Sequence, residues 1–186
     1  MSMMGRKQLA GALAGAAAAV ALAVGASPAA AFNVGVGASV HGSLASPAFT
    51  LGGSFITCTN VSMGGQVTVN NGAGNGGQIS VSVAQPTGCS VISPSNPATV
   101  TFAVPRTLTM AAGGASTIAN AALTTTFGSQ TCTFGGQITG TFTSATSHLV
   151  LGGALVRMTG GFPCPSSAAV GGTLYLWANG VIPLQL

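Results

Sequence analysis

Short runs in which apolar and small or polar residues alternate recur along most of this chain of 186 residues. A period of two places every second side chain on the same face of a β-strand. Gly, Asn and Pro separate the runs, and Asn179-Gly180 is a strong hairpin signal. The pattern predicts an all-β fold, an antiparallel β-sandwich or a small barrel, as one domain over residues 32–186. The stretch 111–122 is the one candidate for a helix, although its glycine pair disfavours it. The clearest alternating runs are residues 32–40, 79–83, 99–104, 123–127, 138–142 and 174–177.

Residues 1–31 have the three parts of a secretory signal peptide. Arg6 and Lys7 supply positive charge, Ala, Gly, Val and Leu dominate the following apolar run, and Ala29 to Ala31 supply the small residues that signal peptidase requires. An uncleaved anchor helix is the alternative, but Ala and Gly are only weakly apolar. We expect cleavage after Ala31. The product would be a secreted or cell-surface domain without a transmembrane helix.

The chain contains no Asp and no Glu. This excludes paired-carboxylate glycosidases, aspartic proteases, Asp-oriented catalytic triads and carboxylate-held Ca²⁺ or Mg²⁺ sites. His41 and His148 remain as candidate bases, but no carboxylate can orient them, and we expect both to be surface or turn residues. After signal removal, Arg106 and Arg157 are the only permanently charged side chains, too few to neutralise a run of phosphates. We therefore expect no enzyme activity, no catalytic residues, no cofactor and no nucleic-acid partner.

Four cysteines in an exported chain indicate a disulfide framework, for which three pairings are conceivable. A repeated pattern favours one of them. Cys58 and Cys132 each lie in a Thr-Cys-Thr segment. After a short spacer, each segment is followed by Gly-Gly-Gln, a β-branched residue and Thr. The next cysteine follows at a similar distance, which suggests two duplicated halves and predicts the bridges Cys58–Cys89 and Cys132–Cys164. A zinc site that includes a histidine is the rival interpretation, but no two cysteines have CxxC spacing, so we expect no metal.

Tyr175 and Trp177 occupy one face of a late alternating run, and Leu174 and Leu176 occupy the other. One of these pairs must point away from the core of a simple sandwich. An exposed aromatic pair is suited to binding a sugar or an apolar ligand, although one face of the run would form core in either case. Arg157 lies within another apolar run, which places it at an edge or mouth of the sheet. Tyr175, Trp177 and Arg157 are therefore the candidate ligand or partner face.

The near absence of charge also bears on partners. A surface of Ser, Thr, Asn and Gln repels neighbouring molecules weakly and favours association. The predicted edge strands lack the Lys and Glu that usually block edge pairing. The expected partners are therefore further copies of the chain, or lipid or glycan of a cell envelope.

The Ala-rich signal and the mature sequence rich in Gly and Thr resemble the small secreted two-disulfide β-proteins of high-GC Gram-positive bacteria. The segment from Cys132 to Phe142, with Leu149 and Cys164 after it, carries most of this resemblance. The region between Cys58 and Cys89 is similar to the secreted activators of alkane oxidation known as PraB-like proteins. That second resemblance implies a role near the envelope in hydrocarbon use. Neither resemblance supplies a functional residue.

Together these features predict a non-enzymatic protein, secreted or held at the cell surface, with a structural or interaction role in the bacterial envelope. The alternative is a binding module for an apolar (hydrocarbon or lipid) or glycan ligand on the Tyr175/Trp177 face. A pore subunit in an outer lipid layer ranks last, because most alternating runs are shorter than the ~9–11 residues of a transmembrane strand.

Overall fold

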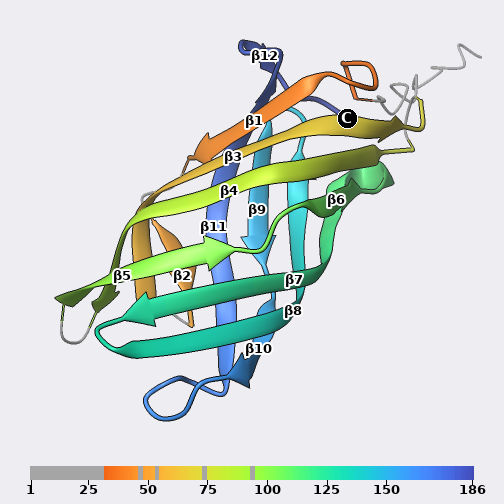
Figure 1. The fold of residues 1–186 in the computed structure, drawn as a ribbon. Helices are drawn as coiled ribbons and strands as arrows, with labels where there is room; N and C mark the ends of the chain where they lie inside the picture. The colour runs from red at the N-terminus through yellow and green to blue at the C-terminus, as the bar shows by residue number, and fades with distance from the viewer. Residues whose placement is uncertain (1–31, 46–47, 53–54, 73–74, 93–94) are drawn as a thin grey trace, which may run out of the picture.

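The computed structural model describes residues 32–45, 48–52, 55–72, 75–92 and 95–186, and Figure 1 shows their arrangement. The predicted signal peptide, residues 1–31, lies outside the described residues. The described chain is almost entirely β-strand, which confirms the predicted fold class. Its strands are β1 (Ser39–Leu44), β2 (Phe49–Leu51), β3 (Ile56–Asn70), β4 (Gly77–Ile92), β5 (Ser95–Phe102), β6 (Arg106–Met110), β7 (Ala115–Phe127), β8 (Gln130–Thr143), β9 (His148–Gly152), β10 (Ala154–Thr159), β11 (Ser167–Ala178) and β12 (Ile182–Pro183).

The strands form a closed antiparallel barrel with eight strand positions, so the barrel alternative is correct and the sandwich is not. Three positions are each filled by two short strands in succession. Both β1 and β2 pair with β3 and β11, both β5 and β6 pair with β4 and β7, and both β9 and β10 pair with β8 and β11. The chain visits the positions in order, and the barrel closes where β11 pairs with β1 at Val40↔Ala178.

Alternate side chains along each strand fill the interior of the barrel. On β11, Leu174 and Leu176 are buried, while Tyr175 and Trp177 between them are only partly buried and lie on the outer face. An eight-strand barrel is just wide enough for side chains to fill it, so the alternation seen in the sequence becomes an inside and an outside. The largest fully buried side chains are Phe49, Phe134, Leu51, Ile56, Ile79, Leu108, Met110, Leu123, Leu149, Leu155, Leu176 and Leu184.

Two segments depart from their expected structure. The candidate helix at 111–122 is wrong. Only Ala112–Gly114 form a 3₁₀ turn, and β7 begins at Ala115, because its Thr and apolar residues pair with β8 and bury alternate positions. The alternating run at 32–40 becomes strand only from Ser39 onward. Before it, the amide of Asn70 donates to the carbonyls of Phe32 and Val34, and these two side chains are buried against the barrel.

The two ends of the described chain meet at the end of the barrel where β12 lies (Figure 1). The backbone N–H of Asn33 donates to the carbonyl of Gln185 at 3.1 Å, and the N–H of Gln185 donates to the side chain of Asn33 at 3.1 Å. The side chain of Asn33 also donates to the carbonyl of Pro183 at 2.8 Å. Residues at the start of the predicted mature chain are therefore part of the fold.

Both predicted disulfides are present. Cys58 on β3 lies directly opposite Cys89 on β4, while Cys132 on β8 is joined to Cys164 in the connection between β10 and β11. The two repeated motifs lie on β3 and β8, which occupy the second and sixth of the eight strand positions. This half-barrel offset is the arrangement that a duplication would produce, and duplication itself stays a prediction.

Candidate ligand-binding site

Four ring side chains line up on the outer face of the barrel. Tyr175 and Trp177 of β11 stand beside the two histidines of the chain, because His148 on β9 is the register partner of Tyr175 and His41 on β1 is the register partner of Trp177. We call these four residues the aromatic strip. Three neighbouring strands supply it, and His41 joins it only because the barrel closes between β11 and β1.

The rings of the strip are in contact range of one another. The centroids of His41 and Trp177 are 6.0 Å apart with 24° between the planes, and those of Tyr175 and Trp177 are 5.8 Å apart with 26° between them. His148 meets Tyr175 edge-on at 6.0 Å and 84°. His41 is exposed and the other three are half-buried, so the strip presents aromatic surface to solvent while its packing restricts side-chain motion.

A groove of ≈ 330 Å³ runs beside the exposed side of His41. Its floor is the backbone at Gly64 and Gly65 of β3, where the register with β4 shifts by a bulge. A Cβ at Gly65 would lie 2.3 Å from the carbonyl oxygen of Ser80, so only glycine fits this close approach of the two strands. The groove is lined by Ser39, His41, Gly64, Gly65, Gln66, Ser80, Ser82 and Val83.

A second hollow of ≈ 300 Å³ lies on the other side of the strip, where Tyr175 and Trp177 meet the turn residues Gly180 and Val181. Trp177 and His41 therefore stand between two depressions in the surface. Val181 is 84% exposed, which adds an apolar wall to an otherwise aromatic hollow.

The lining of both depressions carries hydroxyl, amide and imidazole groups but no carboxylate, Lys or Arg. Ser82 donates to the carbonyl of Gly64 at 3.4 Å, and Ser39 and Ser80 also line the groove. Ring faces combined with neutral hydrogen-bonding groups suit an uncharged ligand that carries both C–H surface and hydroxyls. Within the described ranges, no three His, Cys, Asp or Glu side chains come together as a metal site.

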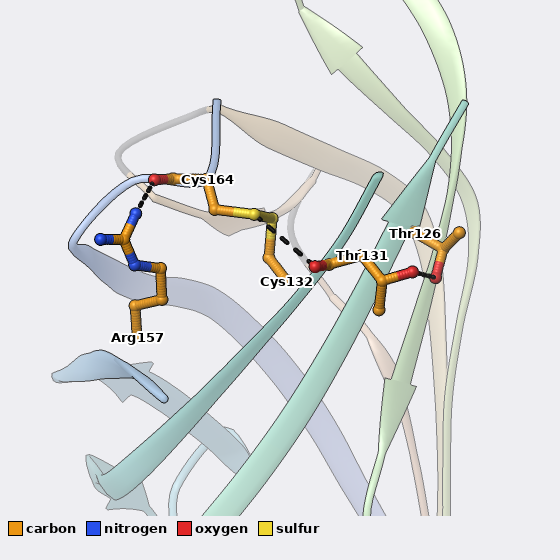
Figure 2. Close-up of a disulfide and its surroundings, with 5 residues drawn as sticks. All are labelled: Thr126, Thr131, Cys132, Arg157 and Cys164. Atoms are coloured by element: carbon orange, nitrogen blue, oxygen red, sulfur yellow. Dashed lines mark hydrogen bonds between the residues drawn. A yellow bond between two sulfur atoms is a disulfide. The ribbon is translucent and has the colours of Figure 1, made fainter. Parts of the chain in front are cut away.

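Arg157 does not join the strip. Its neighbour Val156 pairs with Ser167 at the start of β11, while Tyr175 and Trp177 lie near the end of that strand. Figure 2 shows the Arg157 guanidinium donating to the carbonyl of Cys164, next to the Cys132–Cys164 disulfide. Arg157 therefore fastens the connection between β10 and β11.

Sequence reasoning located the aromatic pair and expected both histidines at surface or turn positions, but it did not connect them with that pair. The signal for His148 was available in principle, since β9 and β11 are consecutive positions of the barrel. The signal for His41 was not, because its pairing with Trp177 depends on closure between distant parts of the chain.

No helix in the part of the chain that the structure describes combines the length and hydropathy needed to cross a membrane. No protein-family model, no curated protein and no solved structure matches this chain.

Proposed function

We propose that this protein is an exported, non-enzymatic binding protein that holds an uncharged glycan on the aromatic strip. The observation that carries the proposal is the strip itself: three near-parallel rings and a fourth edge-on ring, with a polar groove beside them. Sugar rings bind aromatic faces through their C–H surfaces and bind Ser and Gln side chains through their hydroxyls.

Export is supported by two features. The two disulfides are consistent with an oxidising, extracellular environment. The signal peptide predicted over residues 1–31 supplies the route, and the resemblance to small secreted two-disulfide proteins points the same way. A site at the cell surface or in the envelope would bring the strip close to glycan.

The proposal that the protein is not an enzyme rests on which acid and base groups the chain contains. No carboxylate side chain exists anywhere in the sequence to orient His41 or His148, or to act as an acid or base itself. Both histidines lie against aromatic rings at opposite ends of the strip, so they do not converge on one reacting atom. The arrangement favours binding over bond cleavage.

A glycan fits the strip better than a hydrocarbon does. The ≈ 330 Å³ groove lies at the lower end of the roughly 300–1,000 Å³ range of small-molecule sites, and most of its side chains are polar. An alkane would leave those hydroxyls without partners, at a cost of about 1–3 kcal/mol for each desolvated group. The packed apolar interior also argues against an aqueous channel through a single barrel.

An envelope-associated structural role is the second candidate, and one surface favours it. Val156, Met158 and Phe162 are 63%, 67% and 96% exposed, at or beside β10, at the far end of the barrel from β12 (Figure 1). Large exposed apolar side chains close together are typical of association surfaces. This role and glycan binding use different ends of the molecule, so they are compatible.

Isothermal titration calorimetry of the oxidised mature protein, residues 32–186, against neutral gluco-, manno- and galacto-oligosaccharides tests the proposal. We expect at least one series to bind, and Trp177→Ala to weaken it at least ~10-fold, about 1.4 kcal/mol. Phe162→Ala is the matched control, because it removes an exposed aromatic ring outside the strip and should leave affinity unchanged. Absence of binding across all series, or equal losses in the two variants, would refute the proposal.

A further inference from the structure

The wall of the barrel is interrupted between β4 and its neighbours β5 and β6. The pairing of β4 with β5 ends at Cys89↔Ala98, and the pairing of β4 with β6 begins only at Val81↔Arg106. The stretches between these pairs have no register partner on each other. Figure 1 shows β5 and β6 as successive segments between β4 and β7. The interruption therefore lies where one strand position passes from its first segment to its second.

The pairing of β5 and β6 with β7, on the side away from β4, is also irregular. Pairing of β5 with β7 ends at Phe102↔Leu123, and pairing of β6 with β7 resumes at Leu108↔Ile118. In the same stretch β7 contains a bulge, and Asn120 has a φ of 52°, which residues other than glycine rarely adopt. A break and a bulge thus face each other across this part of the wall.

Two small cavities lie behind the interruption. One of ≈ 50 Å³ reaches inward to side chains of the core, and one of ≈ 30 Å³ reaches outward to the break between β5 and β6. They share five lining residues, so they are neighbours along one path from the wall to the interior. Apart from one arginine, every side chain along the path is apolar. The shared residues are Val81, Ala84, Phe102, Ile118 and Ile138.

That arginine is Arg106, at the outer end of the path. It has the same strand parity as Leu108 and Met110, both buried, so its side chain starts toward the interior and is half-buried. Its Nε donates to the carbonyl of Asn120 and its Nη1 to the carbonyl of Pro105, each at 2.9 Å. Nη2 makes no hydrogen bond within the described ranges. The sequence holds no Asp or Glu that could neutralise it.

We propose that this opening binds a short-chain aliphatic carboxylate, with its head on the Arg106 guanidinium and its alkyl chain directed past Ala84 and Phe102 into the barrel. A guanidinium fixed by two carbonyls presents its remaining donors in the planar geometry that carboxylates match. An anion would bind favourably to this half-buried cation, which has no counter-ion. An alkyl chain attached to the anion would bury its apolar surface along the path. The cavities admit only a short chain, because their ≈ 30 and ≈ 50 Å³ correspond to a few water molecules at about 10–15 Å³ each.

The site is separate from the aromatic strip and does not depend on the proposed glycan function. The strip lies on the outer face of β1, β9 and β11. The path from Arg106 is lined by inward-facing side chains, so where β9 and β11 contribute to it they do so from the opposite face. Trp177→Ala should therefore leave carboxylate binding unchanged, and failure of either proposal is visible without the other.

Calorimetric titration of the mature protein with butanoate, hexanoate and octanoate at constant ionic strength tests the inference, with hexan-1-ol as the uncharged counterpart. We expect hexanoate to bind at least tenfold more tightly than hexan-1-ol and more tightly than butanoate. Arg106→Gln should weaken hexanoate at least tenfold. Arg157→Gln is the matched control, since it removes the other arginine of the domain, and should have no effect.

Two further variants keep the test decisive if Arg106→Gln folds poorly. Arg106→Lys retains the charge but loses the planar fork, and should bind hexanoate with intermediate affinity. Ala84→Leu fills the path while leaving Arg106 in place, and should weaken octanoate more than butanoate. Equal affinity for hexanoate and hexan-1-ol, no binding of any carboxylate, or an unchanged affinity in both Arg106→Gln and Ala84→Leu would overturn the proposal.

Discussion

Removing each disulfide in turn separates two explanations of how the bridges stabilise the barrel. The bridges close loops of nearly equal length, with sequence separations of 31 and 32. If they act mainly by restricting the unfolded chain, each contributes about 3.7 kcal/mol at 25 °C, from the logarithm of its loop length. The variants Cys58→Ala/Cys89→Ala and Cys132→Ala/Cys164→Ala should then lose equal stability. All four cysteines are buried, so the packing cost of the change to alanine is similar in both.

The native surroundings of the two bridges differ, so the two explanations predict different results for the two variants. The ladder between β3 and β4 already holds Cys58 opposite Cys89 without the bond. Cys164 lies outside a strand. The main other restraints on its segment are the side-chain hydrogen bond of Arg157 to Cys164 and two backbone bonds, from Cys164 to Gly161 and from Arg157 to Ser166. If native contacts controlled stability, the second bridge would contribute much more than the first.

Urea unfolding of the oxidised mature protein and the two double variants measures the difference. We expect losses of about 3–4 kcal/mol in both variants, equal within about 1 kcal/mol. Hydrogen exchange should show that only the Cys132→Ala/Cys164→Ala variant also loosens residues 160–166 in the native state. Global losses that differ by more than about 2 kcal/mol would refute the unfolded-chain explanation.

Three further predictions follow from local features. Gly65→Ala should lower the free energy of unfolding by about 1–3 kcal/mol, measured in urea, because the new Cβ would lie 2.3 Å from the Ser80 oxygen. Gly35→Ala is the control and should be neutral, because its Cβ would have nothing within 4 Å. Equal effects of the two changes would contradict the close approach at Gly65. Thr125→Val should raise the free energy of unfolding by about 1 kcal/mol, because Thr125 is 0% exposed and its hydroxyl has no hydrogen-bond partner among the described residues; a loss of stability would show an unseen partner. The exported protein should begin at Phe32 by N-terminal sequencing, and a retained segment before it would disprove the predicted cleavage.

The sequence was most informative where a feature depends on neighbouring residues. Strand alternation placed Leu174 and Leu176 on one face and Tyr175 and Trp177 on the other, because a period of two needs no knowledge of the partner strands. The structure shows that the leucines form the inner face. The disulfides were predictable because a repeated motif reduced three pairings to one. The helix candidate at 111–122 was wrong, because Ala and Thr residues with weak local preference became strand through pairing with β8.

Features that depend on closure could not be predicted. Val40 pairs with Ala178 across nearly the whole domain, and the pairing of β11 with β1 and β2 is what distinguishes the closed barrel from a sandwich. His41 reaches the aromatic strip by the same closure. In the sequence, Arg106 is an isolated charge. Its position at an opening depends on the gap in pairing beside β4 and on the bulge in β7, and neither feature leaves a pattern in the residues themselves.

Fluorescence of Trp177 tests the central claim most directly, because this is the only tryptophan in the chain and it lies in the middle of the strip. The mature protein would be titrated with the neutral oligosaccharides, and quenching by acrylamide would be measured with and without them. Glycan binding on the strip predicts a saturable change in emission, protection from acrylamide, and weaker binding in His41→Ala. Unchanged emission with every glycan, while acrylamide quenches Trp177 equally in its presence and absence, would contradict the account.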